Sequence, residues 1–181
     1  MLQMNESKDK PLSKKQIQNE LWYRGNLSWK LKSNQREMYD LFYTSEHKVQ
    51  TWLLSRRSGK SYTLCVLAIE ACLKNSNSVV KFLSPTKTQV NMNLRPIMRK
   101  ILEDCPNDIK PEYKMQDYIY YFPNGSEIQL AGTDSGHAEK LRGGDSDLFF
   151  VDEAGSCDDL DDIIKNILLP TTLITKGRGI L

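Results

Sequence analysis

The chain has 181 residues, of which 39% are hydrophobic and 27% charged, a balance that is typical of a water-soluble globular domain. Its net charge of +2 gives no argument for or against a polyanionic partner. The four cysteines show no C-x-x-C spacing, which argues against a zinc or redox site, and no apolar run is long enough to cross a membrane.

Hydrophobic periodicity predicts alternating helices and strands after a polar N-terminal stretch. Residues 1–21 are rich in lysine and are expected to form a flexible lead, with one domain over 22–181. In chain order, the predicted elements are a helix over 35–47, a strand over 49–54, a helix over 61–73, a strand over 79–83, a helix over 90–105, a hairpin over 117–132, a strand over 148–151 and a helix over 158–169.

Two local signals refine this reading. Pro96 is expected to kink or restart the third helix, and Asn124-Gly125 is a strong turn signal for the hairpin. Strands that alternate with helices predict an α/β fold with a parallel sheet, to which the hairpin would be an edge or lateral addition.

The segment LSRRSGKS at 54–61 predicts a phosphate-binding loop, because it lies between a strand and a helix and ends in Gly-Lys-Ser. Leu54 stands where the full motif has its first glycine. Lys60 is expected to reach the β- and γ-phosphates, and the Ser61 hydroxyl to ligate Mg²⁺. The residues expected to line the phosphate site are Ser55, Arg56, Arg57, Ser58, Gly59, Lys60 and Ser61.

The segment LFFVDEAG at 148–155 is the second functional signal, because an apolar strand ends there in two acids. In a phosphate-loop enzyme a strand beside the loop supplies a carboxylate to the metal shell, and Asp152 fits that role. Glu153 is expected to polarise the attacking water. The alternative is that both acids simply begin a solvated turn. The combination with Gly-Lys-Ser favours nucleotide hydrolysis.

The arginines of the loop suggest stabilisation of transition-state charge in cis. We expect Arg56 to be the catalytic arginine and give Arg57 less weight, while either side chain could instead cover the surface or pair with an acid.

These two core motifs resemble those of the large terminase subunit of tailed bacteriophages, an ATP-driven motor that packs DNA into a procapsid. Softer matches occur in the same order along the chain, at LKSNQREMY (31–39), FLSPTKTQ (82–89), FPNGSEIQLAG (122–132) and KLRGGDSDLFFVDE (140–153).

The resemblance implies a P-loop NTPase fold of the ASCE/RecA-like type, with ATP as substrate and Mg²⁺ as cofactor. It implies catalytic roles for Glu153, Lys60 and Arg56, metal binding by Ser61 and Asp152, and contact between Gln35 and the adenine base. It further implies work on double-stranded DNA, with a portal protein, a small terminase subunit and a homo-oligomeric ring as partners, in the cytoplasm of an infected bacterium and without a membrane.

The family's coupling motif and nuclease domain have no counterpart in the printed sequence. We therefore expect an ATPase domain that is truncated at its C-terminus, that is weakly active or inactive alone, and that has no nuclease activity.

Two alternatives stay open at this point. A DExx-type helicase or translocase shares the acidic motif and the upstream glutamine, although it usually keeps the first loop glycine. A nucleotide-binding interaction module without turnover is the other. A GTP switch of that class would need an Asn-Lys-x-Asp segment, which the sequence lacks.

Overall fold

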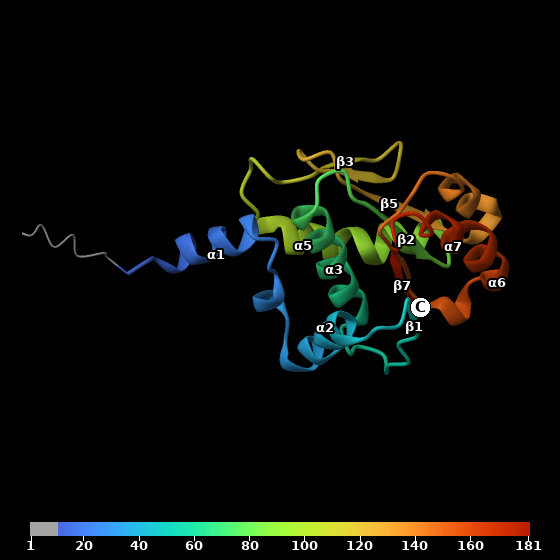
Figure 1. Cartoon of the computed structure of the whole chain (residues 1–181), viewed down its shortest axis with the longest axis horizontal. Coiled ribbons are helices and arrows are strands. Elements are labelled where there is room, and N and C mark those ends of the chain that lie inside the picture. The colour runs from blue at the N-terminus through green and yellow to red at the C-terminus, as the bar shows by residue number, and fades with distance from the viewer. Residues whose placement is uncertain (1–10) are drawn as a thin grey trace, which may run out of the picture.

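The computed structural model describes residues 11–181. Its centre is a seven-stranded sheet (Figure 1). The strands in spatial order are β1 (Val49–Gln50), β7 (Arg178–Ile180), β6 (Leu148–Val151), β2 (Val79–Ser84), β5 (Glu127–Gly132), β4 (Ile119–Tyr121) and β3 (Glu112–Lys114). Neighbours from β1 to β5 in this order are parallel, whereas β4 and β3 are antiparallel. The predicted α/β fold with a parallel sheet is confirmed.

Helices connect these strands. The α-helices are α1 (Lys14–Tyr23), α2 (Ser33–Thr44), α3 (Lys60–Lys74), α4 (Lys87–Gln89), α5 (Arg95–Ile101), α6 (Leu160–Asp162) and α7 (Leu169–Thr171). The π-helical turns Val90–Leu94 and Ile163–Leu168 join α4 to α5 and α6 to α7. The two joined runs match the helices predicted over 90–105 and 158–169 to within a few residues. Pro96 lies in the first turn of α5, where a missing N–H is tolerated.

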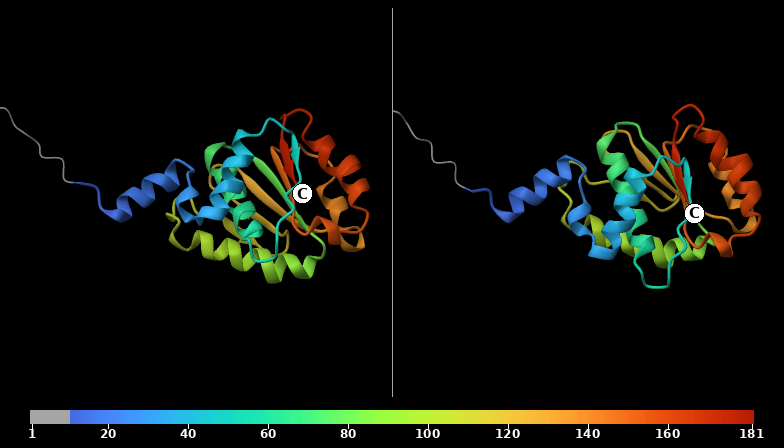
Figure 2. Two further views of the ribbon diagram at one scale, coloured as in Figure 1. Left: turned by 90° about the horizontal axis from the view of Figure 1, so that it is seen from below. Right: turned by 60° about the horizontal axis from the view of Figure 1, so that its bottom comes forward.

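The two faces of the sheet have separate cores, because side chains alternate along each buried strand. On β6, Phe150 packs into the core that α2, α3 and α5 cover, whereas Phe149 and Val151 pack against the run from α6 to α7. The two helical layers can be followed on either side of the sheet in Figure 2. Burial on both faces explains why this strand is apolar at every position.

The predicted hairpin forms toward one edge of the sheet, as expected, but only its first strand, β4, is an addition there, because β5 belongs to the parallel part of the sheet. Ile119 pairs with Gln129 across the antiparallel ladder between β4 and β5. On its other side β5 pairs in parallel with β2 over its whole length, from Val79–Glu127 to Ser84–Gly132. The physical reason is that Ile128 and Leu130 are buried, so β5 belongs inside the sheet, and β4 and β3 form its edge.

The strand that leads into the loop is shorter than the predicted 49–54 segment. Beyond β1, the N–H of Trp52 still donates to the carbonyl of Leu181 at 2.9 Å, but Leu53 is 97% exposed. The acidic strand β6 does not pair with β1, because β7 lies between them. Gly179 permits the insertion, since a side chain there would overlap the Phe149 ring.

The first helix, α1, occupies residues that were expected to belong to a flexible lead. The side chain of Ser13 caps it and forms a reciprocal capping box with Gln16. Residues 1–10 of the expected lead lie outside the described residues. Within residues 11–181, no helix has both the length and the apolar character needed to cross a membrane.

Candidate functional site

The loop between β1 and α3 lies at the carboxyl edge of the parallel strands, the edge where open α/β sheets bind ligands. Gly59 caps α3 with a φ of 89°, a conformation that side-chain-bearing residues rarely adopt. A side chain at this position would also overlap the amide group of Gln35. Glycine is therefore needed here both for its conformation and for a close approach to a neighbouring helix.

Lys60, Ser61 and Asp152 meet at this edge, although the sequence separates the first two from the third by about half the chain. The Ser61 hydroxyl donates to Oδ2 of Asp152 at 2.5 Å. The Lys60 ammonium lies 3.4 Å from Oδ1 of the same carboxylate. The Asp152 side chain is only 5% exposed, so both contacts act where solvent screening is weak. The spatial arrangement expected from the two motifs is present.

The donor set at this point fits a hard divalent cation. Within the described residues, no group of three or more His, Cys, Asp or Glu side chains is arranged to hold a metal. The chain instead offers one carboxylate, that of Asp152, and one hydroxyl, that of Ser61. Mg²⁺ commonly binds through one or two protein oxygens and completes its octahedron with water and substrate phosphates. These two residues could therefore hold Mg²⁺ only together with a phosphate-bearing ligand.

Glu153 follows Asp152 in a strained backbone conformation. Its φ and ψ are 55° and 41°, in the left-handed region. Three hydrogen bonds hold this backbone: the Glu153 N–H donates to Oδ1 of Asp152 at 3.2 Å, and its carbonyl accepts from the Ser156 N–H at 2.8 Å and from the Cys157 thiol at 3.8 Å. The Glu153 side chain is exposed and makes no hydrogen bond or ion pair with residues 11–181. This geometry leaves its carboxylate free to interact with a ligand or a water molecule.

The two loop arginines are exposed. Neither Arg56 nor Arg57 makes a hydrogen bond or ion pair with the described part of the chain. Arg57 has a φ of 65°, and the loop turns back on itself where the Ser58 N–H donates to the Ser55 carbonyl at 3.3 Å. The alternative that one of these arginines pairs with an acid is therefore not supported by any contact within residues 11–181.

Gln35 lies beside the loop, and its amide bonds to the protein. Its Nε2 donates to the Gly59 carbonyl at 3.3 Å, and its Oε1 accepts from the Lys32 N–H at 2.9 Å. Asn34, which sequence reasoning missed, donates to the Ser58 carbonyl at 2.9 Å. The only available signal was its position next to the expected adenine-binding glutamine. In this structure α2 holds the loop at two adjacent carbonyls.

Two buried charges were also missed, and each follows an apolar run in the sequence. Glu70 on α3 and Lys81 on β2 are 0% and 1% exposed. Lys81 donates to the carbonyls of Leu141, Gly143 and Gly144 at 2.9–3.1 Å, and so anchors the segment that precedes β6. A single charge inside a continuous apolar run was the signal that could have identified both.

Comparisons with known proteins point to one family. A model of the family described as "Terminase large subunit, T4likevirus-type, N-terminal" matches residues 52–163, which is more than half of the chain. The match includes the whole loop over 54–61, the five strands β2 to β6 and the acidic motif. No curated protein sequence matches the chain.

Solved structures share the fold at low sequence identity. The large terminase ATPase domain of Thermus phage P74-26 is 18% identical with a TM-score of 0.66, and the match covers 88% of this chain and 66% of that domain. The large terminase of a thermophilic bacteriophage is 14% identical with a TM-score of 0.61, over 94% of this chain and 38% of that protein. A structure of the latter in complex with ADP matches with a TM-score of 0.60. At these identities the likeness shows the fold, and the chain spans less than two thirds of each relative.

Proposed function

The chain belongs to the family of terminase large subunits, and we propose that it is the ATPase domain of a viral DNA-packaging motor. The proposed reaction is hydrolysis of the bond between the β- and γ-phosphates of ATP with Mg²⁺. The proposed work is translocation of double-stranded DNA into a procapsid. The family match favours this function over the helicase and switch alternatives, and the convergence of Lys60, Ser61 and Asp152 is the observation that carries it.

The loop would bind the triphosphate through its backbone. Consecutive N–H groups at the start of α3 are not used by the helix itself, and they form a site that favours anions. The Lys60 ammonium would then exchange the Asp152 carboxylate for the β- and γ-phosphate oxygens. Such an exchange needs only a side-chain rotation, because the Lys60 side chain is 18% exposed at the mouth of the site.

Asp152 and Ser61 are the residues that would hold Mg²⁺. When bound, Mg²⁺ neutralises negative charge on the phosphate oxygens and orients them for displacement. The carboxylate of Asp152 is released for this role when Lys60 turns to the phosphates. The Ser61 hydroxyl already lies 2.5 Å from Oδ2 of Asp152, so both oxygens can approach one ion.

Glu153 would orient the attacking water and accept its proton. Its exposed carboxylate follows Asp152 directly, and its left-handed backbone redirects the chain at the end of β6. Arg56 would stabilise the charge that develops on the γ-phosphoryl oxygens, with Arg57 as the second candidate. Gln35 would contact the adenine, for which its amide must exchange the Gly59 carbonyl for the base.

A basic groove supports the proposed DNA partner. Between α5 and β3 lies a groove of about 830 Å³ whose charged lining residues are Arg95, Arg99, Lys100, Lys110 and Glu103. Four positive charges against one negative charge favour a phosphate backbone. The remaining parts of the proposal come from the family. The proposed partners are double-stranded DNA, a portal protein and a small terminase subunit. The chain would act in a ring of identical subunits, in the cytoplasm of an infected bacterium.

The decisive experiment measures ATP binding and hydrolysis by wild type, Lys60→Ala and Glu153→Gln. We expect Lys60→Ala to weaken ATP binding at least tenfold, since it removes the only loop ammonium. We expect Glu153→Gln to bind ATP normally and to lose roughly 100-fold or more in turnover, as for other general bases. Glu153→Asp is the matched control for charge. Turnover is measured with the chain alone and in a DNA-packaging reaction.

If the wild-type protein does not bind ATP, the proposed ATPase function is refuted. Unchanged turnover in Glu153→Gln would leave ATP hydrolysis in place but would exclude Glu153 as the residue that activates water.

A further inference from the structure

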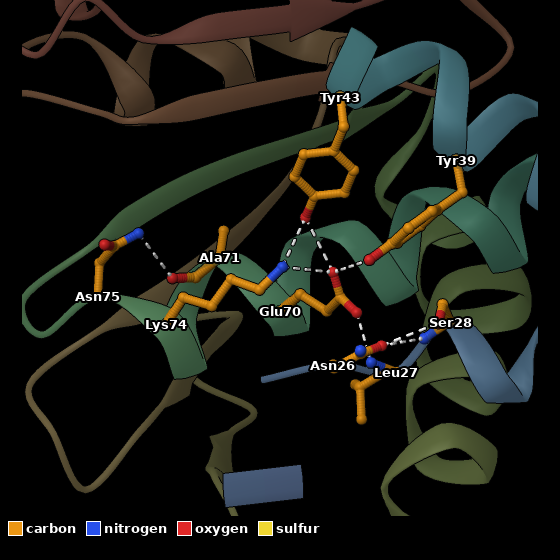
Figure 3. Close-up of polar contacts among 9 residues, drawn as sticks. All are labelled: Asn26, Leu27, Ser28, Tyr39, Tyr43, Glu70, Ala71, Lys74 and Asn75. Atoms are coloured by element: carbon orange, nitrogen blue, oxygen red, sulfur yellow. Dashed lines mark hydrogen bonds and ion pairs between the residues drawn. The ribbon is translucent and has the colours of Figure 1, made fainter. Parts of the chain in front are cut away.

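The carboxylate of Glu70 is the most fully satisfied buried charge in the described chain, and it lies away from the nucleotide site. It is 0% exposed and accepts hydrogen bonds from three segments (Figure 3). Its Oε1 accepts from the Leu27 N–H. Its Oε2 accepts from the Tyr39 hydroxyl at 2.8 Å, the Tyr43 hydroxyl at 2.9 Å and the Lys74 ammonium at 3.0 Å.

The two tyrosines remain donors over the usual range of pH. Burial, and then the negative charge of Glu70, raises the pKa of Tyr39, and the same two causes raise the pKa of Tyr43. Their rings also contact each other, with centroids 4.9 Å apart. The Lys74 ammonium donates to the Tyr43 hydroxyl at 3.0 Å as well. The network therefore fixes both the separation and the rotation of α2 against α3.

The other end of α2 holds the phosphate loop. Within residues 11–181, Asn34 and Gln35 are the only residues outside α3 whose side chains hydrogen-bond to residues 55–59. Both come from the first turn of α2, whereas Tyr39 and Tyr43 lie one and two turns further along the same helix. A helix transmits position along its length, so a shift of α2 at the tyrosines moves Asn34 and Gln35 relative to the loop.

Stability alone is a weak reason for such a network. Burying a charged pair costs desolvation energy, and replacement by apolar residues of similar volume is often neutral or stabilising. What a saturated carboxylate does provide is a unique arrangement, because each missing donor leaves a buried acceptor unpaired.

We propose that Glu70 is a positioning residue for the phosphate loop: through Tyr39 and Tyr43 it sets α2 so that Asn34 and Gln35 hold the carbonyls of Ser58 and Gly59. This inference rests on the proposed function for the purpose of the loop. Its structural content, a link from Glu70 through α2 to residues 58 and 59, can be tested without nucleotide.

Native-state trypsin cleavage gives a direct measurement of this link. Arg56 and Arg57 are exposed in the loop, and trypsin cleaves after each when the segment opens locally. Exposed Lys176, in the turn before β7, serves as an internal reference for general loosening. The measured quantity is the ratio of cleavage at Arg56 and Arg57 to cleavage at Lys176, in nucleotide-free protein.

We expect Tyr39→Phe, Tyr43→Phe and Glu70→Gln each to raise this ratio roughly threefold or more, the scale of one lost hydrogen bond. Asn34→Ala should raise it directly. In the double variant Asn34→Ala/Tyr39→Phe, the increase should be smaller than the product of the single increases, because both changes act on one route. Tyr23→Phe is the matched control: its hydroxyl donates to Asp108 at 3.1 Å, away from the network, and the ratio should not change.

An unchanged ratio in Tyr39→Phe and Tyr43→Phe, together with a raised ratio in Asn34→Ala, would overturn the inference. Independent, multiplicative effects in the double variant would also overturn it. If Glu70→Gln fails to fold, the tyrosine variants still decide the question, since Tyr43 is 45% exposed and we expect its variant to fold. Failure of the wild type to bind ATP would refute the proposed function and leave these cleavage ratios unaffected.

Discussion

Two buried carboxylates lie near opposite ends of helix α3, Asp152 against its start and Glu70 within it, and their partners differ in kind. At the N-terminal end, Asp152 interacts with the side chains of Lys60 and Ser61, both at the start of the helix. Toward the other end, Glu70 accepts hydrogen bonds from three separate segments. Under the proposed function, the partners of Asp152 would be replaced by a ligand, whereas the partners of Glu70 hold the fold together.

The two sites would therefore differ in role: the partners of Asp152 would be exchanged for a ligand, whereas Glu70 would keep its partners and position α2. In the proposed mechanism Lys60 would turn from Asp152 to a phosphate, an exchange that moves a side chain and no strand or helix. No comparable exchange is open to Glu70, because loss of the Leu27, Tyr39 or Tyr43 donor would leave α2 or the Leu27 turn unsupported. Both sites use the same physical chemistry, a buried negative charge, and differ in whether the partners are free to move.

The largest expected effect is on folding stability, and it should differ between the two sites. Glu70→Ala removes the acceptor of four protein donors and should lower the free energy of unfolding by about 3–5 kcal/mol. Asp152→Ala should cost less than half of that, because Lys60 and Ser61 can turn to solvent. Chemical denaturation of both variants measures the difference. Equal losses would erase the distinction between the two carboxylates.

The second expected effect concerns the cation and belongs to the Asp152 site alone. Asp152→Asn keeps the shape of the side chain but removes the charge that would hold Mg²⁺. We expect Mg²⁺ to strengthen ATP binding by the wild type. In this variant the factor by which Mg²⁺ strengthens binding should be roughly tenfold smaller, a difference of about 1.4 kcal/mol. Glu70→Gln is the matched control and should retain the Mg²⁺ effect, even if ATP binds more weakly overall. A Mg²⁺ effect that survives in Asp152→Asn would assign the cation to other ligands.

The convergence of Lys60, Ser61 and Asp152 could be predicted from the sequence because its signals are local. Gly-Lys-Ser after a strand, and two acids after an apolar strand, are short patterns, and parallel topology brings the ends of such strands to one edge. The position of β5 inside the sheet was missed, because a hairpin turn predicts the pairing of β5 with β4 but not its pairing with β2 on the opposite side. Glu70 was missed for a related reason: its partners at residues 27, 39 and 43 come from segments whose packing no local pattern specifies.

Local signals also failed where the loop meets α2. The sequence suggested Gln35 as an adenine contact, and the structure adds a bond from its amide to Gly59 that no spacing rule contains. The bond depends on the left-handed glycine and on the angle between α2 and α3. Both are consequences of packing, which is the level where the predicted site and the observed site differ.

Lys81 is a buried positive charge and can be compared with the two buried carboxylates. The effect expected for it is the smallest of the three. Burial lowers the pKa of Lys81 from 10.5 to about 8, although its ammonium donates to three carbonyls. Between these two values the unfolded chain binds more protons than the folded chain, so stability should rise with pH. The comparison variant is Lys81→Met, which does not titrate. The difference in unfolding free energy, wild type minus variant, should increase by about 1 kcal/mol from pH 8 to pH 9.

Subtracting the variant matters, because buried tyrosines and cysteines titrate in the same range and oppose the trend. Burial raises the pKa of Cys105 to about 12, for example, so the folded chain keeps that proton longer than the unfolded chain and loses stability as pH rises. Such contributions are common to wild type and Lys81→Met and cancel in the difference. A flat difference would mean that the three carbonyls keep the ammonium charged as firmly as water does. Lys81 would then resemble Glu70, a buried charge whose partners fully replace its solvent.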